Sequence, residues 1–161
     1  FSPLFGANEM SRSYIPTFFR RFMDGDGRVP VEVVMGGDAA MDLAKARQKD
    51  FINCGTKCFL SSHQMTLTHS DTEMPFPFQS LFKRCRALLM NRQVEAIVLV
   101  IQTDELLHLG LPVDRINQIL TAAGELTSWK NPGDKLPESV SDSMLALLKE
   151  TANRKGLSAK G

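Results

Sequence analysis

The sequence has few cysteines, a single tryptophan, a single tyrosine and no long hydrophobic run. Three cysteines at irregular spacing do not make a disulfide framework, and together with eight methionines they indicate a reducing compartment. The longest apolar run, Ala96–Ile101, is far too short to cross a bilayer, so we expect no membrane partner. Neither sign of charge dominates, because 19 Lys and Arg oppose 18 Asp and Glu. Any surface that binds a polyanion must therefore be local.

The 161 residues are enough for one domain or two small ones. The hydrophobic share of 43% and the charged share of 23% are ordinary for a globular protein, and they exclude collagen-like, coiled-coil and wholly disordered chains. The sequence opens at Phe1 instead of Met, which we interpret as processing or trimming. A removed organelle transit peptide is one explanation, and a chain boundary chosen for expression is another.

Hydrophobic patterning in the first part of the chain predicts an extended arm followed by a small α/β unit. Residues 1–17 show no period, which is typical of an arm that becomes ordered only on a partner. Residues 18–62 predict, in order, a strand at 18–23, an Asp-Gly turn at 24–27, a Val-rich strand at 31–34, a helix at 39–48 with Asp38 as its N-cap, and short strands at 51–52 and 57–60.

The second part, residues 63–150, predicts a β-α-β-α-β-β unit followed by a frayed polar tail at 151–161. Its expected elements are a strand at 65–68, a helix at 78–91, a central strand at 94–101, a loop with two acids at 103–110, a helix at 112–123 ended by Gly124, a strand at 126–129, and a strand or short helix at 144–148. The expected fold class is therefore α/β (α+β), built as two small units, with the two helices of the second unit packed on one sheet face.

Residues that could carry chemistry are sparse. Cys54, Cys58, His63 and His69 are zinc-ligand types within sixteen positions, but their spacing matches no zinc finger or knuckle. The favoured interpretation is two half-buried cysteines and two surface histidines. A metal-dependent enzyme that uses these four residues is the weakest of the functional hypotheses that the sequence supports. Cys85 lies on the apolar stripe of helix 78–91, where a thiol is buried and inert. We therefore predict a protein without catalytic residues, metal or cofactor.

The helix at 78–91 carries the most suggestive surface. Its helical period places Lys83 in the middle of the face opposite the apolar stripe, with Arg84 and Arg86 beside it and Arg92 just beyond the helix end. These four cations are not interrupted by an acid, so they are candidates for binding RNA phosphates. The alternative is an ordinary solvated helix face. A second group of candidate contacts, for tRNA or other RNA, lies near the N-terminus: Arg20, Arg21 and Arg28.

Several local strings resemble bacterial and organellar translation initiation factor 3. In the first unit these are the strand, acidic-Gly turn, strand and Ala/Leu-rich helix at 22–27, 31–35 and 39–43, and the segment Asn53 to Leu60. In the second they are the basic and apolar helix string at 83–89, the strand at 94–100 and the segment 144–149. The chain departs from the family in having almost no Lys-rich linker and in having Gln102-Thr103-Asp104-Glu105 where the family has an arginine-rich loop.

The resemblance implies a non-enzymatic factor that binds the RNA and proteins of the small ribosomal subunit. Such a factor prevents premature joining of the large subunit and assists selection of the initiator tRNA and start codon. So diverged a member fits a mitochondrial matrix protein better than a bacterial one. The main alternative is a structural or assembly subunit of a ribosome or another large complex, which would remain with complete particles instead of dissociating.

Overall fold

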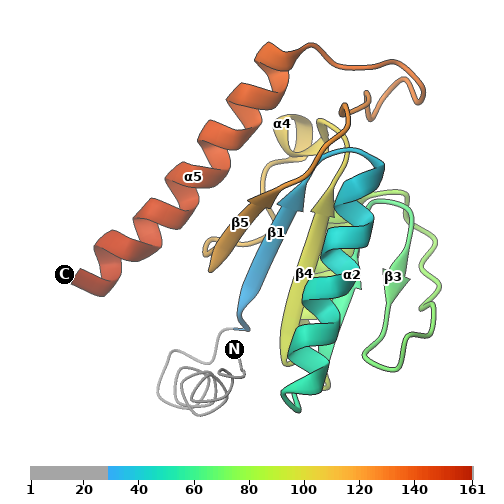
Figure 1. The fold of residues 1–161 in the computed structure, drawn as a ribbon, viewed down its shortest axis with the longest axis vertical. Coiled ribbons are helices and arrows are strands. Elements are labelled where there is room, and N and C mark those ends of the chain that lie inside the picture. Colours follow the sequence, from blue (N-terminus) through green and yellow to red (C-terminus); the bar gives the residue numbers. More distant parts are fainter. Residues whose placement is uncertain (1–28, 161) are drawn as a thin grey trace.

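The computed structural model describes residues 29–160, and side chains as far as residue 152. Its centre is a five-stranded sheet in the order β3-β2-β4-β1-β5, in which β3 alone runs antiparallel to its neighbour (Figure 1). The strands are β1 (Val31–Met35), β2 (Cys58–Ser61), β3 (Thr66–Leu67), β4 (Ala96–Ile101) and β5 (Gln118–Thr121).

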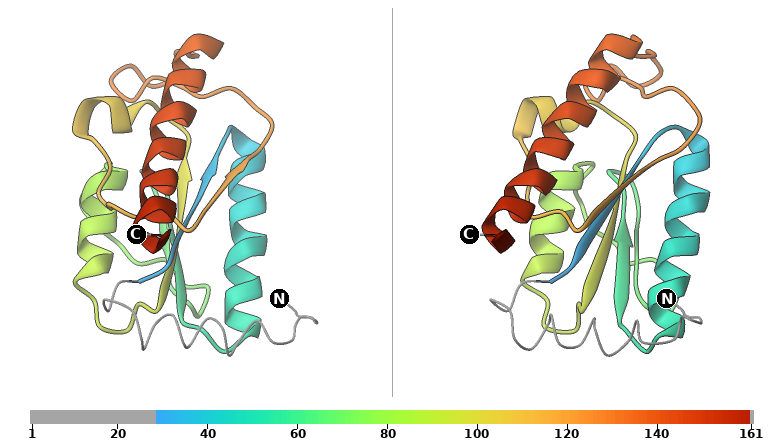
Figure 2. Two further views of the ribbon diagram at one scale, coloured as in Figure 1. Left: turned by 90° about the vertical axis from the view of Figure 1, so that its left-hand side faces the viewer. Right: turned by 60° about the vertical axis from the view of Figure 1, so that its left-hand side comes forward.

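Helices cover the sheet on both faces, so the described residues form three layers. Figure 2 shows α2 (Asp38–Asn53) on one side and α3 (Leu81–Leu89) and α5 (Glu138–Lys160) on the other. The short helix α4 (Glu105–Leu109) follows β4 at the carboxyl edge of the sheet. Among residues 29–160, no helix combines the length and the apolar character that a bilayer span requires.

The core explains why the strand sequences are almost entirely apolar. Every residue of β1, β2 and β4 is buried, as expected for parallel strands that lie under helices on both faces. The cluster beneath α3 and α5 includes Val33, Phe59, Leu88, Ile97, Leu99, Met144 and Leu148. The cluster beneath α2 includes Val34, Ala40, Ala44, Leu60, Val98 and Val100. Two fully buried alanines let the backbone of α2 approach the sheet closely.

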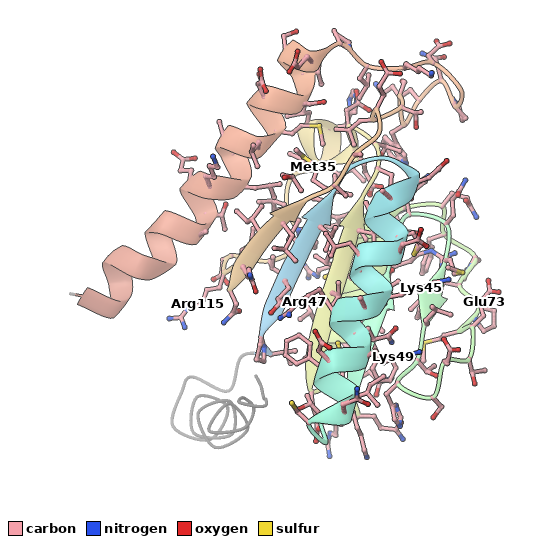
Figure 3. All side chains as sticks on the ribbon, viewed as in Figure 1. Met35, Lys45, Arg47, Lys49, Glu73 and Arg115 are labelled. Atoms are coloured by element: carbon pink, nitrogen blue, oxygen red, sulfur yellow. The ribbon has the colours of Figure 1, made fainter. Side chains whose placement is uncertain are left out.

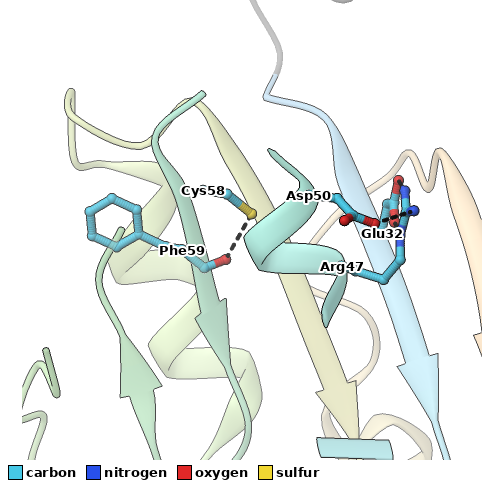
Figure 4. Close-up of polar contacts among 5 residues, drawn as sticks. All are labelled: Glu32, Arg47, Asp50, Cys58 and Phe59. Atoms are coloured by element: carbon cyan, nitrogen blue, oxygen red, sulfur yellow. Dashed lines mark hydrogen bonds and ion pairs between the residues drawn. The ribbon is translucent and has the colours of Figure 1, made fainter. Parts of the chain in front are cut away.

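One buried charge interrupts this pattern. Glu32 lies within β1 and is 5% exposed, and its carboxylate receives two hydrogen bonds from the Arg47 guanidinium of α2, at 2.8 and 2.9 Å. Figure 4 shows this paired geometry, together with the Asp50 carboxylate, to which the Arg47 guanidinium also donates at 3.3 Å. In Figure 3, Arg47 lies on the side of α2 toward β1, whereas Lys45 and Lys49 lie on the other side. The bidentate pair satisfies the buried carboxylate and fixes α2 against β1.

Two glycines allow the chain after β1 to touch the chain after β5. A Cβ on Gly36 would lie 2.5 Å from the carbonyl oxygen of Ala122, and one on Gly37 would lie 2.7 Å from the Cα of Gly124. The Gly37 N–H also donates to the carbonyl of Ala123 at 3.2 Å. This Gly-Gly pair therefore serves a backbone-to-backbone contact that any side chain would prevent.

Most elements expected from periodicity are confirmed. The strands expected at 31–34, 57–60, 65–68 and 94–101 correspond to β1, β2, β3 and β4. The helices expected at 39–48 and 78–91 correspond to α2 and α3, and the segment 144–148 takes the helical alternative within α5. The expected arm, the strand at 18–23, the turn at 24–27 and residue 161 lie outside the described residues.

Several expectations are wrong. Residues 51–52 continue α2 instead of forming a strand, because Phe51 repeats the buried spacing of Ala44 and Gln48. The expected helix at 112–123 contains the strand β5, which pairs with β1, and the expected loop at 103–110 contains α4. The expected strand at 126–129 reduces to isolated bridges at Thr127. Residues 151–160, expected to be a frayed tail, continue α5.

The division into units at 18–62 and 63–150 also differs from the structure. Strand β1 lies between β4 and β5, so strands from both segments alternate in one sheet. Two helices do share one sheet face, but they are α3 and α5, since the segment 112–123 is not helical. A mixed α/β fold is confirmed, whereas its arrangement is that of one interleaved sheet.

We predict that replacing Gly37 with Ala destabilises the protein by about 1–3 kcal/mol, because the new methyl group would meet backbone atoms that have no flexible end to move aside. Urea unfolding followed by circular dichroism measures this change. As a control, Ala39→Ser alters an exposed position of the same helical turn and should change stability by less than about 0.5 kcal/mol. Equal stability of the Gly37→Ala variant and the parent would contradict the assigned contact.

Candidate functional site at the carboxyl edge of the sheet

The connections that leave β1 and β4 diverge to opposite faces. From β1 the chain enters α2 and returns as β2, two places away in the sheet. From β4 it passes through α4 and an extended segment, whose Leu111, Val113 and Ile116 pack on the opposite face, before it forms β5. In open α/β sheets, ligands bind in the crevice that such divergence leaves at the carboxyl ends of the strands.

A cleft of about 390 Å³ lies at this position. It is bounded by the segments that follow β1, β2, β4 and β5 and by Gln79, just before α3. Its lining residues are Gly37, Asp38, His63, Gln64, Gln79, Gln102, Thr103, Glu125, Thr127, Ser128, Trp129, Pro132 and Gly133. Most of these side chains are polar and uncharged, which distinguishes the cleft from the apolar interior beneath it.

A loop at 125–136 forms the outer wall of the cleft, and the end of β4 holds it in place. The Thr127 N–H donates to the carbonyl of Gln102 at 3.0 Å, and the Leu136 N–H donates to that of Leu126 at 2.8 Å. The Gln102 side chain reaches across to the carbonyl of Gly37 at 3.1 Å. The wall is therefore continuous with the ends of β1 and β4, and its geometry depends on their pairing.

The two acids that follow β4 are structural supports of this region. The Asp104 carboxylate accepts a hydrogen bond from the backbone N–H of Trp129 at 2.9 Å and lies 3.3 Å from the His108 imidazole. Glu105 is 4% exposed and accepts hydrogen bonds from the Ser80 hydroxyl and from the first two N–H groups of α3, at 2.7 to 2.8 Å. These carboxylates thus anchor the Trp129 loop and the start of α3 respectively.

Trp129 presents a half-buried indole to the cleft. Its Nε1–H donates to the carbonyl of Gln79 at 3.1 Å, and the imidazole of His108 lies against its ring at a centroid distance of 5.9 Å. An indole fixed by a hydrogen bond at one end can offer its remaining surface to a ring-shaped ligand. Trp129 is the only tryptophan in the sequence.

His63 lies where the cleft meets a second, small pocket that is lined by residues of α3 and α4. That pocket has room for about 20 Å³, which is enough for one water-sized group. The Nδ1 atom of His63 is buried and makes no hydrogen bond within the described residues. Burial lowers the pKa of His63, outweighing the opposite effect of Glu105, so its imidazole is neutral at pH 7.

The charged side chains of the cleft are acidic. Asp38 is exposed in the first turn of α2, and Glu125 forms an exposed ion pair with Lys135 at 3.1 Å. The lining contains neither Lys nor Arg. The amino end of α2 carries a partial positive charge that could attract an anion, but the Asp38 carboxylate in its first turn offsets that charge.

The expected basic face of α3 is only partly present. Lys83, Arg86 and Arg92 are exposed, but Arg84 is 3% exposed, so its expected position on the solvent face is wrong. Its guanidinium donates to the Thr66 hydroxyl at 2.9 Å and to the carbonyls of Phe78 and Phe76 at 2.8 and 3.3 Å. The buried stripe of α3 is rotated from the expected one and consists of Leu81, Arg84, Cys85 and Leu88.

Aromatic rings accompany the cations that remain exposed. The Lys83 ammonium lies 5.9 Å from the centre of the Phe78 ring, and the Arg86 guanidinium lies 6.0 Å from that of Phe82. Both rings are half-buried. The other expected RNA contacts, Arg20, Arg21 and Arg28, lie outside the described residues.

The cysteines and histidines considered for metal binding do not converge. Among the described residues, no group of three or more His, Cys, Asp or Glu side chains could hold a metal ion. Burial raises the pKa of Cys58 well above its usual range and that of Cys85 to about 12. Both thiols are therefore protonated at neutral pH and unsuited to metal binding or nucleophilic attack.

The sequence does not indicate the cleft, and its only lining residue considered there as a candidate site residue is His63, as a metal ligand. The polar residues His63, Gln102 and Trp129 have no motif spacing, since they come from three separate segments. The available signal was positional: Gln102 and Thr103 follow the central strand, and Gly37 follows β1. Combining these positions required knowledge that β1 and β4 are neighbours, which periodicity does not provide.

We predict that Ellman's reagent modifies Cys54 in the native protein at pH 8, while Cys58 and Cys85 react only after unfolding, because Cys54 is half-buried and the other two thiols are buried with raised pKa values. Absorbance at 412 nm, with and without denaturant, counts the reactive thiols. The variant Cys54→Ser should lose the native reaction. Rapid modification of Cys58 or Cys85 in the native state would contradict their assigned environments.

Comparisons with protein-family models, curated proteins and solved structures give no match for this chain. The resemblance to translation initiation factor 3 therefore stays a prediction.

Proposed function

We propose that this protein binds a small polar molecule in the carboxyl-edge cleft. The observation that carries this proposal is the position of the cleft: it lies where the connections from β1 and β4 diverge, and side chains from five segments line it. A volume of about 390 Å³ falls within the range usual for small-molecule sites.

The state of the lining side chains supports binding over a purely structural role. The side-chain amides of Gln64 and Gln79 are exposed and make no hydrogen bond within the described residues. The Trp129 loop is fixed by Asp104, so the wall of the cleft is already in place. Such pre-positioned groups reduce the ordering that a ligand must impose on the protein when it binds.

We predict that a ligand of the cleft changes the fluorescence of Trp129, which can be excited alone at 295 nm because the chain has a single tryptophan. A panel of nucleosides, nucleotides, sugars, amino acids, carboxylic acids and amines should contain at least one class that gives a saturable change. The variant Gln64→Phe places a ring in the cleft and should weaken that response at least about tenfold, which corresponds to the loss of about one good contact.

The matched control is Gln93→Phe, which makes the same substitution at an exposed position before β4, at the opposite edge of the sheet. This variant should bind like the parent. A panel without any saturable response, or a response that Gln64→Phe leaves unchanged, would refute binding in the cleft.

Binding to RNA of the small ribosomal subunit is a second candidate, which a separate observation favours. Lys83 and Arg86 are exposed next to the half-buried rings of Phe78 and Phe82, and Arg92 lies beyond the helix end. Cations beside aromatic rings can contact phosphates and stack on unpaired bases. On this proposal the protein acts in mitochondrial translation initiation, preventing premature subunit joining, or is a structural subunit of the ribosome.

We predict that the triple variant Lys83→Glu, Arg86→Glu, Arg92→Glu binds isolated small subunits at least about tenfold more weakly than the parent, through the loss of phosphate contacts. Arg84 is left intact because its buried guanidinium supports the fold. The control Lys45→Glu, Lys49→Glu, Lys57→Glu makes the same charge change at exposed positions elsewhere. Equal co-sedimentation of the two variants with small subunits would exclude this surface as the RNA contact.

A further inference from the structure

The charge of the cleft restricts what it can bind. The lining offers two carboxylates, those of Asp38 and Glu125, and no Lys or Arg. Glu125 is paired with Lys135, whereas Asp38 makes no ion pair within the described residues. His63 adds no positive charge at neutral pH, because it is held in its neutral form. A phosphate or carboxylate ligand would therefore meet the Asp38 carboxylate, while the cation beside the lining, Lys135, is already paired with Glu125.

The Gly36-Gly37 turn after β1 does not supply the anion-binding groups that the lining lacks. In phosphate-binding loops, glycines let the ligand approach the backbone N–H groups at a helix start. Here the backbone of Ala122 and Gly124 occupies the space beside Gly36 and Gly37, and the Gly37 N–H is used by the carbonyl of Ala123. The turn is thus filled by protein, and the first turn of α2 also carries Asp38.

The groups that remain suit hydroxyl-bearing ligands. Gln64 and Gln79 each offer an amide donor and acceptor, and the Thr127 hydroxyl also lines the cleft without a hydrogen bond of its own within the described residues. Neighbouring hydroxyl groups of a sugar ring can donate to and accept from such amides at once. The half-buried indole of Trp129 adds an apolar surface for the ring itself.

We infer that the cleft binds a neutral ring that bears neighbouring hydroxyl groups, either as a free sugar or as the ribose of a nucleoside, and that it rejects the phosphorylated form. This inference rests on the proposed binding function and specifies its ligand. Asp38 is the residue that sets the discrimination, because it is the unpaired carboxylate at the cleft.

The test is a titration of Trp129 fluorescence in the full chain with adenosine, methyl riboside, glucose, AMP and putrescine. Adenosine or one of the sugars should give a saturable change, and their relative affinities show whether the base contributes. AMP should bind at least about fivefold more weakly than adenosine, as expected for a like charge beside a solvent-exposed carboxylate. Asp38→Asn should reduce the ratio of the AMP dissociation constant to the adenosine dissociation constant at least about threefold. The control Asp42→Asn, one turn further along α2 and outside the lining, should leave this ratio unchanged.

The outcomes separate this inference from the proposed function. Tighter or equal binding of AMP, or saturable binding of putrescine alone, would overturn the neutral-ligand inference and leave a ligand-binding cleft. If Asp38→Asn left the ratio of the AMP and adenosine dissociation constants unchanged, the role of Asp38 would be overturned. The absence of any response to these five compounds, with a response to another class of the wider panel, would also overturn the inference, whereas silence across the whole panel would refute the cleft as a binding site.

Discussion

The parallel pairing of β1 with both β4 and β5 is the constraint on which the rest of the structure depends. It brings the ends of three strands together, and it requires the chain after β1 to pass within backbone contact of the chain after β5. Gly36 and Gly37 satisfy that requirement. The same pairing places Gln102 within reach of the Gly37 carbonyl and positions the loop that carries Trp129. The cleft is thus a consequence of strand order as much as of its lining residues.

Sequence periodicity predicts the elements whose apolar residues form a continuous run or a regular stripe. Strand β4 is apolar throughout, and α3 carries a clear stripe, so both were found with small errors at their ends. Prediction failed where long-range pairing decides the outcome. The segment 112–123 has helical spacing in Ile116, Ile119 and Leu120, yet Asn117 accepts the Val31 N–H and the chain extends along β1. No local property of that segment reveals the exposed strand edge that it covers.

The positions of the charged side chains likewise depend on contacts that are distant in sequence. Arg84 was expected in solvent with Lys83 and Arg86, but carbonyl groups of the segment before α3 provide buried acceptors for it. Asp104 and Glu105 were visible as two acids in a predicted loop, and their roles as anchors of Trp129 and of α3 follow only from contacts 24 and 25 residues apart in sequence. Long side chains at such positions take their function from distant partners, which composition and spacing do not identify.

The protein is a three-layer α/β scaffold, and the binding site proposed for it lies at one edge of the sheet, with neutral polar groups, a fixed indole and a carboxylate without an ion pair among the described residues. Its most direct test is a two-dimensional NMR spectrum of the ¹⁵N-labelled chain, in which Trp129 supplies the single indole N–H resonance. The account predicts that adenosine or a simple sugar shifts this resonance together with the backbone amides of Gly37 and Gln102. Shifts confined to α3 or to the opposite sheet edge, with the indole signal unmoved, would contradict it.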